Sequence, residues 1–191
     1  KHTRSLVITH KNKLINALFH SSSGGMTENS EDVWSNKYPY LISVKDFDQK
    51  NPKMHWKKIF SNKELQILFP KIGGIKDLEI IDITNTGRVK NIKLIGNYGS
   101  LDFSGTNLRK KMGLKSTLFR FKFVPDNAQQ DISKINNLKA SLIISGMGAG
   151  HGVGMSQWGA KQLAMRGYKA KDILNYFYTG IQIKPFKEIY K

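Results

Sequence analysis

Residues 146–160 read Gly-Met-Gly-Ala-Gly-His-Gly-Val-Gly-Met-Ser-Gln-Trp-Gly-Ala, and this glycine-rich stretch is the strongest signal in the chain. Glycine loses more backbone entropy on folding than any other residue, so such a cluster needs a structural reason. Either the backbone takes positive φ there, or another group approaches the backbone closely. His151 lies inside the stretch, and Gln157 and Trp158 follow it. The pattern predicts a polar site with an aromatic wall, directly before a helix.

The stretch allows two other interpretations, a tight turn and a nucleotide-binding loop. A tight turn of small residues that happens to contain a histidine stays open as the plain alternative. Nucleotide binding is set aside, because the stretch lacks the Lys-Ser/Thr ending of a phosphate-binding loop. It also lacks an acidic residue about twenty positions further on, as a dinucleotide-binding fold requires.

The charge of the chain is unusual, although its length is ordinary. The 191 residues fit one domain, and a lobe over residues 60–125 is an alternative within it. Thirty-one Lys and Arg against fourteen Asp and Glu give a net charge of +17. Such a field favours anionic partners, including anionic wall polymers or a membrane surface, although a solvated lysine-rich surface is the commoner explanation of such a charge. Nucleic acid is rejected, because no recognisable nucleic-acid-binding motif accompanies the charge.

The chain contains no cysteine, which excludes disulfides and thiolate zinc sites. It also shows no signal peptide and no apolar run long enough to span a bilayer. Since Lys1 is not a natural start, we interpret the chain as an N-terminally truncated part of a longer protein.

The first third of the chain predicts strands around a polar loop. Two strands over 5–9 and 14–19 form a hairpin with a turn at Asn12-Lys13. A polar loop over 20–31 begins with His20, and a third strand covers 38–44. A histidine at the end of an apolar strand, followed by hydroxyls, is typical of a binding site; a surface linker is the alternative.

The remaining chain predicts an antiparallel, β-rich α+β fold with short helices. Ser61 and Glu64 form a capping box for a short helix, and a meander follows over 72–103. A second short helix over 104–112 ends at Gly113. Further elements are strands over 118–124 and 138–144, separated by a loop over 125–137, and two C-terminal helices over 156–166 and 170–178, after the glycine-rich loop.

Three separate motifs resemble the SpoIID/LytB family. The first is Gly150-His151-Gly152-Val153-Gly154-Met155-Ser156-Gln157-Trp158-Gly159-Ala160, with Tyr176-Phe177-Tyr178-Thr179-Gly180 after it. The second runs from His20 to Asn29 and continues to Trp34 and Pro39-Tyr40-Leu41. The third comprises Arg109, Gly113-Leu114, Ser116-Thr117 and Phe119. They occur in the family's order and span nearly the whole chain.

The resemblance implies cell-wall chemistry outside the cytoplasm, in the wall, the periplasm or the secreted fraction, with membrane anchoring through an N-terminal segment as one arrangement. The family's SpoIID type is a lytic transglycosylase that cleaves the β-1,4 bond between N-acetylmuramic acid and N-acetylglucosamine of denuded strands, leaving 1,6-anhydro ends. Its LytB type is described as an enhancer of wall amidases. A protonated glutamic acid donates to the glycosidic oxygen, and no cofactor is expected.

The chain departs from the family pattern at the catalytic acid. The family's glutamate lies in a segment that would precede residue 1, so the resemblance leaves the catalytic residue unassigned and the enzyme question open. Glu28 is the only glutamate within a matched motif. We consider it a weak candidate for the acid and expect it to position substrate or fix its loop. Some members bind zinc through cysteines after the matched histidine; serines stand here, so we predict no structural metal.

The predicted substrate contacts come from the two histidine motifs. His20 and His151 are expected to flank a cleft, and Gln157 to hydrogen-bond the sugar, with Trp158 or Trp34 as a stacking face. The complete predicted set is His20, Ser21, Ser22, Thr27, Glu28, His151, Gly152, Ser156, Gln157 and Trp158. A non-catalytic wall-binding module that enhances an N-acetylmuramoyl-L-alanine amidase is the alternative function.

Overall fold

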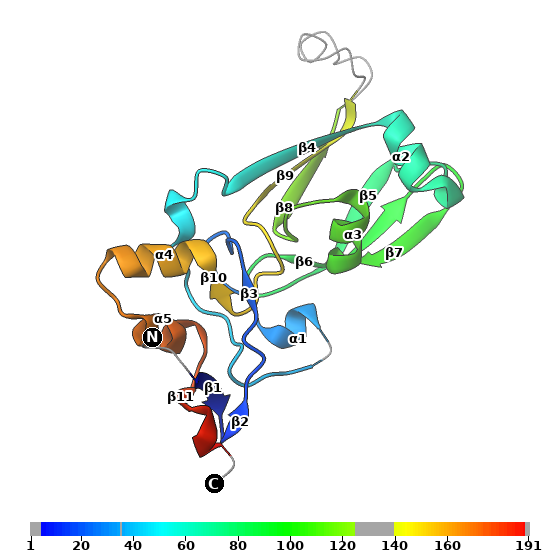
Figure 1. The fold of residues 1–191 in the computed structure, drawn as a ribbon. Coiled ribbons are helices and arrows are strands. Elements are labelled where there is room, and N and C mark those ends of the chain that lie inside the picture. The colour runs from blue at the N-terminus through cyan, green and yellow to red at the C-terminus, as the bar shows by residue number, and fades with distance from the viewer. Residues whose placement is uncertain (1–4, 35, 125–139, 190–191) are drawn as a thin grey trace. The chain divides into compact units, whose positions relative to one another are not determined.

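A computed structural model describes residues 5–34, 36–124 and 140–189 (Figure 1). The chain divides into two compact units. The first unit combines the chain up to Met54 with the chain from Ala149 onward, and the second covers His55–Gly148. The lobe expected over 60–125 lies inside the second unit. The α+β class is confirmed, with mainly antiparallel sheets and short helices.

A three-stranded sheet in the first unit joins the two ends of the described chain. It has the order β11-β1-β2, where β1 is Leu6–His10, β2 is Lys13–Leu14 and β11 is Gln182–Pro185. The predicted hairpin is confirmed, but its turn lies one residue earlier than predicted, at Lys11 and Asn12, whose φ values are 48° and 61°. Positive φ at both turn residues matches the right-handed twist of a two-residue hairpin. The second strand is shorter than predicted, and β11 was not predicted.

Two short parallel strands place the glycine-rich loop beside the polar loop. They are β3, Phe19–His20, and β10, Met155–Ser156. Two short helical segments follow β3 in the chain: α1, Ser30–Val33, and a 3-10 turn, η1, Asp48–Lys50.

The strand predicted over 38–44 is wrong. A turn closed by the Leu41 N–H on the Tyr38 carbonyl, at 3.0 Å, occupies this segment. Tyr40 and Leu41 are consecutive and both buried, which an alternating strand with one solvent face does not allow.

Both C-terminal helices are confirmed. The first, α4, is Gln157–Met165, and the Ser156 hydroxyl caps it by accepting from the Gly159 N–H. The second, α5, is Ala170–Phe177, and a 3-10 turn, η5, covers Phe186–Glu188. The core of this unit is built from these helices and the loops beside them: Tyr40, Leu41, Val153, Leu163, Ile173, Phe177, Tyr178 and Ile181.

The second unit contains two three-stranded antiparallel sheets. The first has the order β4-β9-β8, where β4 is His55–Ser61, β9 is Ala140–Met147 and β8 is Phe119–Phe123. The second is the predicted meander: β5, Asp77–Ile83, β6, Val89–Ile95, and β7, Ser100–Ser104. The strand β4 was not predicted, and the loop predicted over 125–137 lies outside the described residues.

Short helices complete the second unit as predicted. The Ser61–Glu64 capping box begins α2, Asn62–Leu68, which leads to a 3-10 turn, η2, Pro70–Ile72. Ser104 caps α3, Gly105–Met112, which ends at Gly113 in the left-handed conformation. Buried apolar side chains from both sheets and these helices form a single core, which includes Trp56, Phe60, Leu78, Ile92, Leu108, Phe119 and Ile144.

Candidate functional site

The glycine-rich loop uses its glycines in both of the expected ways. Gly148, Gly150, Gly152 and Gly154 have φ of 75°, 113°, 88° and 72°, so every second residue is left-handed. Other residues adopt this conformation only with strain. A Cβ on Gly154 would also collide with the Leu18 carbonyl oxygen, and one on Gly150 would lie 2.7 Å from the Cβ of His20. The loop therefore lies directly against the chain around β3.

Two histidines meet where these chain segments lie together. The His20 and His151 ring centroids are 5.5 Å apart, and the Trp34 and His151 centroids are 5.1 Å apart. His20 is 4% exposed, His151 is half-buried and Trp34 is 36% exposed. The three rings form a row that leads from the interior to the surface.

The backbone of Val153 sets the chemistry of both imidazoles. Its N–H donates to Nδ1 of His151 at 3.1 Å, so in the uncharged ring the proton of His151 lies on Nε2. Its carbonyl lies 3.1 Å from Nδ1 of His20, and since a carbonyl only accepts, Nδ1 of His20 is the donor. The two uncharged rings therefore have opposite tautomers, with the proton on Nδ1 in His20 and on Nε2 in His151.

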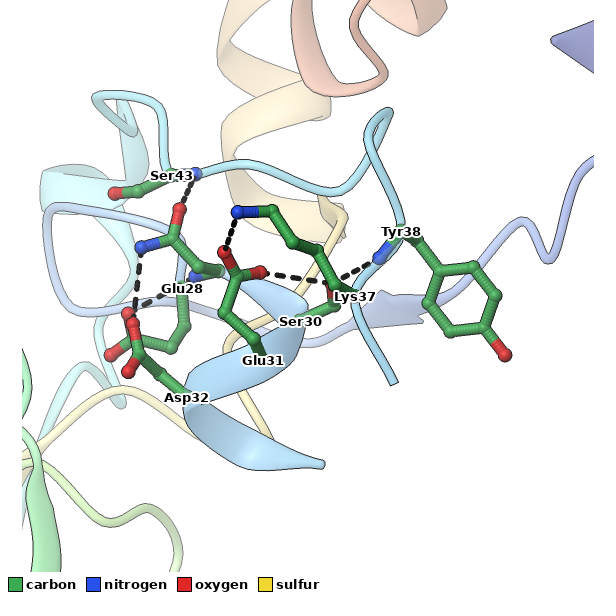
Figure 2. A network of polar contacts seen from close by, with 8 residues as sticks. Glu28, Ser30, Glu31, Asp32, Lys37, Tyr38 and Ser43 are labelled. Atoms are coloured by element: carbon green, nitrogen blue, oxygen red, sulfur yellow. Dashed lines mark hydrogen bonds and ion pairs between the residues drawn. The ribbon is translucent and has the colours of Figure 1, made fainter. Parts of the chain in front are cut away.

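A polar network around α1 positions Trp34, the residue that follows this helix. Figure 2 shows Ser30, Glu31, Lys37 and Tyr38 linked to one another: the Ser30 hydroxyl accepts from the Tyr38 N–H at 2.8 Å, and Lys37 pairs with Glu31 at 3.2 Å. The Trp34 N–H donates to the Ser30 carbonyl at 2.9 Å. These bonds fix both ends of a helix that is too short to be stable alone.

A second part of the network holds the start of α1 against the neighbouring loop. Asn29 accepts from the Ser43 N–H at 2.8 Å and donates to Asp32 at 3.1 Å (Figure 2). The aromatic face offered by Trp34 is thus supported by side chains on both sides of α1.

Glu28 is fully buried beside the glycine-rich loop. Its N–H donates to the Gly152 carbonyl at 2.8 Å, and its backbone forms a parallel bridge with Val153. Its carboxylate accepts from the Asn29 N–H at 3.1 Å. The backbone of Glu28 thus ties the polar loop to the glycine-rich loop, and the role expected of its carboxylate stays a prediction.

Several predicted contact residues have hydroxyls that are bonded within the protein. Ser22 and Ser156 are buried, and the Thr27 hydroxyl is bonded to the backbone of Val44. Ser21 is half-buried, and its carbonyl accepts from the Trp158 N–H at 3.1 Å.

The start of α4 offers more accessible groups. Gln157 is exposed, whereas Gly152 is buried. Trp158 is half-buried, and the Lys161 ammonium lies 4.7 Å from its ring centroid. Gln157, His151 and Trp34 are therefore the side chains best placed to meet a ligand.

Two buried aspartates that sequence reasoning missed hold the serine loop. Asp48 accepts from the Ser22 hydroxyl at 2.5 Å and from the Gly24 N–H at 2.8 Å. Asp46 accepts from the Ser23 hydroxyl at 2.6 Å. Both aspartates are 0% exposed. The Ser-Ser-Gly-Gly run after the matched histidine was the available signal, because hydroxyls and free N–H groups in a buried loop need acceptors.

Burial raises the pKa of the Asp46 carboxyl above its ordinary value of 3.8. The charge of Asp48 acts in the same direction, and hydrogen bonds from Ser156 and Ser23 oppose it. The folded state therefore binds this proton more tightly than the unfolded chain. The stability that this carboxyl contributes is present below about pH 3.8 and is lost as the pH rises through the raised folded pKa.

We accordingly expect the stability of Asp46→Asn, relative to wild type, to increase as the pH is raised from 3.8 towards neutrality. Urea unfolding of both proteins at a series of pH values measures this difference. A difference that stays constant over the series would contradict the raised pKa.

No group of three or more metal-ligating side chains occurs among the residues that the structure describes. Over the same residues, no helix is long and apolar enough to cross a membrane.

Comparison with known proteins identifies relatives over almost the whole chain. No family model matches. Stage II sporulation protein D of Bacillus subtilis (strain 168) is 34% identical over 183 residues, which cover 95% of this chain and 48% of that protein. The protein of the same name from Bacillus amyloliquefaciens is 33% identical over the same shares. An amidase enhancer of Bacillus subtilis is 28% identical over 96% of this chain and 32% of its own length. The chain thus spans about half the length of the two sporulation relatives and a smaller share, 32%, of the length of the amidase enhancer.

Proposed function

Because the chain belongs to the SpoIID/LytB family, we propose that it binds glycan strands of bacterial peptidoglycan, as part of a lytic transglycosylase. The row formed by Trp34, His151 and His20 carries the proposal. An exposed indole offers an apolar face for a sugar ring, and the half-buried polar imidazole of His151 lies against it. The wall or another extracytoplasmic location follows from such a substrate.

The reaction proposed for the whole enzyme is cleavage of the bond between N-acetylmuramic acid and N-acetylglucosamine in denuded strands. An acid protonates the departing glycosidic oxygen, and the muramic 6-hydroxyl closes on the anomeric carbon as that bond breaks. The carboxylate left by the acid takes the proton of the 6-hydroxyl, which gives a 1,6-anhydro end. We assign His151, Trp34 and Gln157 to substrate binding. Glu28 is assigned to fixing the loop, because its carboxylate is buried and accepts a backbone N–H.

Enhancement of a wall amidase is the second candidate. The similarity to the amidase enhancer covers 96% of this chain, and the net charge of +17 suits adhesion to an anionic wall. This function requires wall binding but no cleavage of the glycan.

Glycan binding is tested with His151→Ala and denuded strands. We expect about tenfold weaker binding in a sedimentation assay, since the polar ring that lies against both Trp34 and His20 is lost. His10→Ala is the matched control, because His10 also contacts an aromatic ring, that of Tyr40 at 5.5 Å, but lies in β1. If both variants bind like wild type, His151 is not a contact residue.

The two candidate functions are separated by products and by rates. Mass spectrometry of digested strands detects 1,6-anhydro ends, and release of dye from labelled wall measures a purified amidase with and without the chain. Anhydro ends produced by the chain alone would make Glu28 the leading acid. Faster amidase action without anhydro ends would instead support the enhancer function.

A further inference from the structure

A groove of about 920 Å³ lies entirely within the second unit, and its lining includes Gly146 and Met147, the first residues of the glycine-rich stretch. It is formed where β4 and β8 begin and β9 ends, with β5 contributing Ile80. Leu118 and Met147 line it and are half-buried, and Ile80 is 39% exposed. Trp56 and Phe119 also line it, but both are buried in the core of this unit. The size and the mostly apolar lining are typical of ligand-binding sites.

Gly146 lets the core pack tightly against β9, one of the strands that form the groove. It pairs in register with both Trp56 and Phe119, so the three positions lie in one row across the sheet. A Cβ at Gly146 would collide with the indole ring of Trp56. The missing side chain lets the indole lie over the β9 backbone, between its two neighbouring strands.

Basic side chains form the next row of the same sheet, which projects from the opposite face to Trp56 and Phe119 and shares its face with Met147. Lys57 and Arg120 both pair in register with Ser145, so they lie on either side of it, with Cα atoms about 10 Å apart. Both are exposed, and neither has an ion-pair partner in the part of the chain that the structure describes. His55 also lines the groove, and no carboxylate does.

This combination selects one class of ligand. A polyol phosphate would satisfy Lys57 and Arg120 but leave the wall of Ile80, Leu118 and Met147 without an apolar partner. An oligonucleotide would find no exposed Trp, Tyr or Phe side chain among the lining residues on which its bases could stack, because Trp56 and Phe119 are buried. A lipid surface is flat and would not enter a groove. An extended peptide supplies both carboxylates and apolar side chains. We propose that this groove binds an acidic peptide segment with apolar side chains, contributed by a protein partner. The site is independent of the glycan-binding function proposed above.

The test is selection of random twelve-residue peptides displayed on phage against the whole chain. We expect enrichment of sequences that combine Asp or Glu with aliphatic or aromatic residues. The best peptide is then synthesised with a fluorescent label, and its binding is measured by anisotropy. No enrichment, or enrichment of sequences without acidic residues, would overturn the proposal.

Matched variants locate the peptide. We expect Lys57→Glu/Arg120→Glu to bind about tenfold more weakly, and Ile80→Ser several-fold more weakly. Lys76→Glu/Lys115→Glu changes the net charge equally at exposed positions that do not line the groove, and should bind like wild type. Equal loss in both double variants would mean attraction by overall charge alone. Tighter binding of a labelled oligothymidylate, lost in the groove variant only, would replace the peptide with nucleic acid.

Discussion

Replacing Gly154 by alanine is expected to lower the free energy of unfolding by about 3 kcal/mol or more. Gly154 has φ of 72°, where an L-residue is strained, and a new Cβ would collide with the Leu18 carbonyl oxygen. That oxygen accepts from the Met155 N–H at 3.1 Å and from the Tyr178 hydroxyl at 2.7 Å. Displacing this oxygen would weaken both hydrogen bonds, the one from Met155 at the start of β10 and the one from the buried Tyr178.

Gly167→Ala is the matched control for Gly154→Ala. Gly167 has φ of 90°, but nothing lies within 4 Å of a Cβ built on it. This variant therefore experiences only the backbone strain, about 1 kcal/mol. Urea unfolding followed by circular dichroism compares the two. Equal losses of stability would show that close approach to the Leu18 carbonyl is not what requires glycine at position 154.

The elements predicted correctly are those whose signals are local. Helix ends are marked by pairs of residues that lie close together in the sequence. The pairs are Ser61 with Glu64 at one helix start, and Ser104 with Gly113 and Ser156 with Gly167 at the two ends of a short helix. In these cases the sequence contains both the signal and its partner side by side.

The missed strands depend on distant partners. The strand β11 pairs with β1 from the opposite end of the described chain, and β4 pairs with β9. Their polar residues give weak strand signals, and pairing outweighs local preference. The segment 38–44 failed for the converse reason, because its β-prone residues pack in a turn.

The candidate site was predictable in its glycines and histidines but not in its supports. His20, His151 and Trp34 lie in motifs that composition alone makes conspicuous. Asp46 and Asp48 are ordinary loop residues in sequence, and the serines that they bind precede them by more than twenty positions. Only the fold reveals that they are buried.

Asp48→Ala is expected to lower the free energy of unfolding by about 3 kcal/mol, because it leaves the Ser22 hydroxyl and the Gly24 N–H buried without their acceptor. Asp48→Asn keeps an acceptor oxygen and should lose less. The control is Asp102→Ala, an exposed strand residue whose loss should cost no more than about 0.5 kcal/mol. If Asp48→Ala is as stable as this control, the carboxylate does not hold the serine loop.

The same variant should also weaken glycan binding, through the backbone and not through contact with the sugar. The N–H of Ser22 donates to the Ala149 carbonyl at 3.1 Å, and the Ala149 N–H returns a bond to Ser22 at 2.7 Å. A loosened serine loop therefore loosens the chain on either side of His20 and His151.

Removing the charge of Asp48 also lowers the pKa of Asp46, since that charge helps to raise it. We therefore measure the difference in free energy of unfolding between Asp46→Asn and its parent as a function of pH, with Asp48 intact and in the Asp48→Asn background. The change in this difference should occur at lower pH in the Asp48→Asn background. A purely mechanical role of Asp48 would not produce this shift.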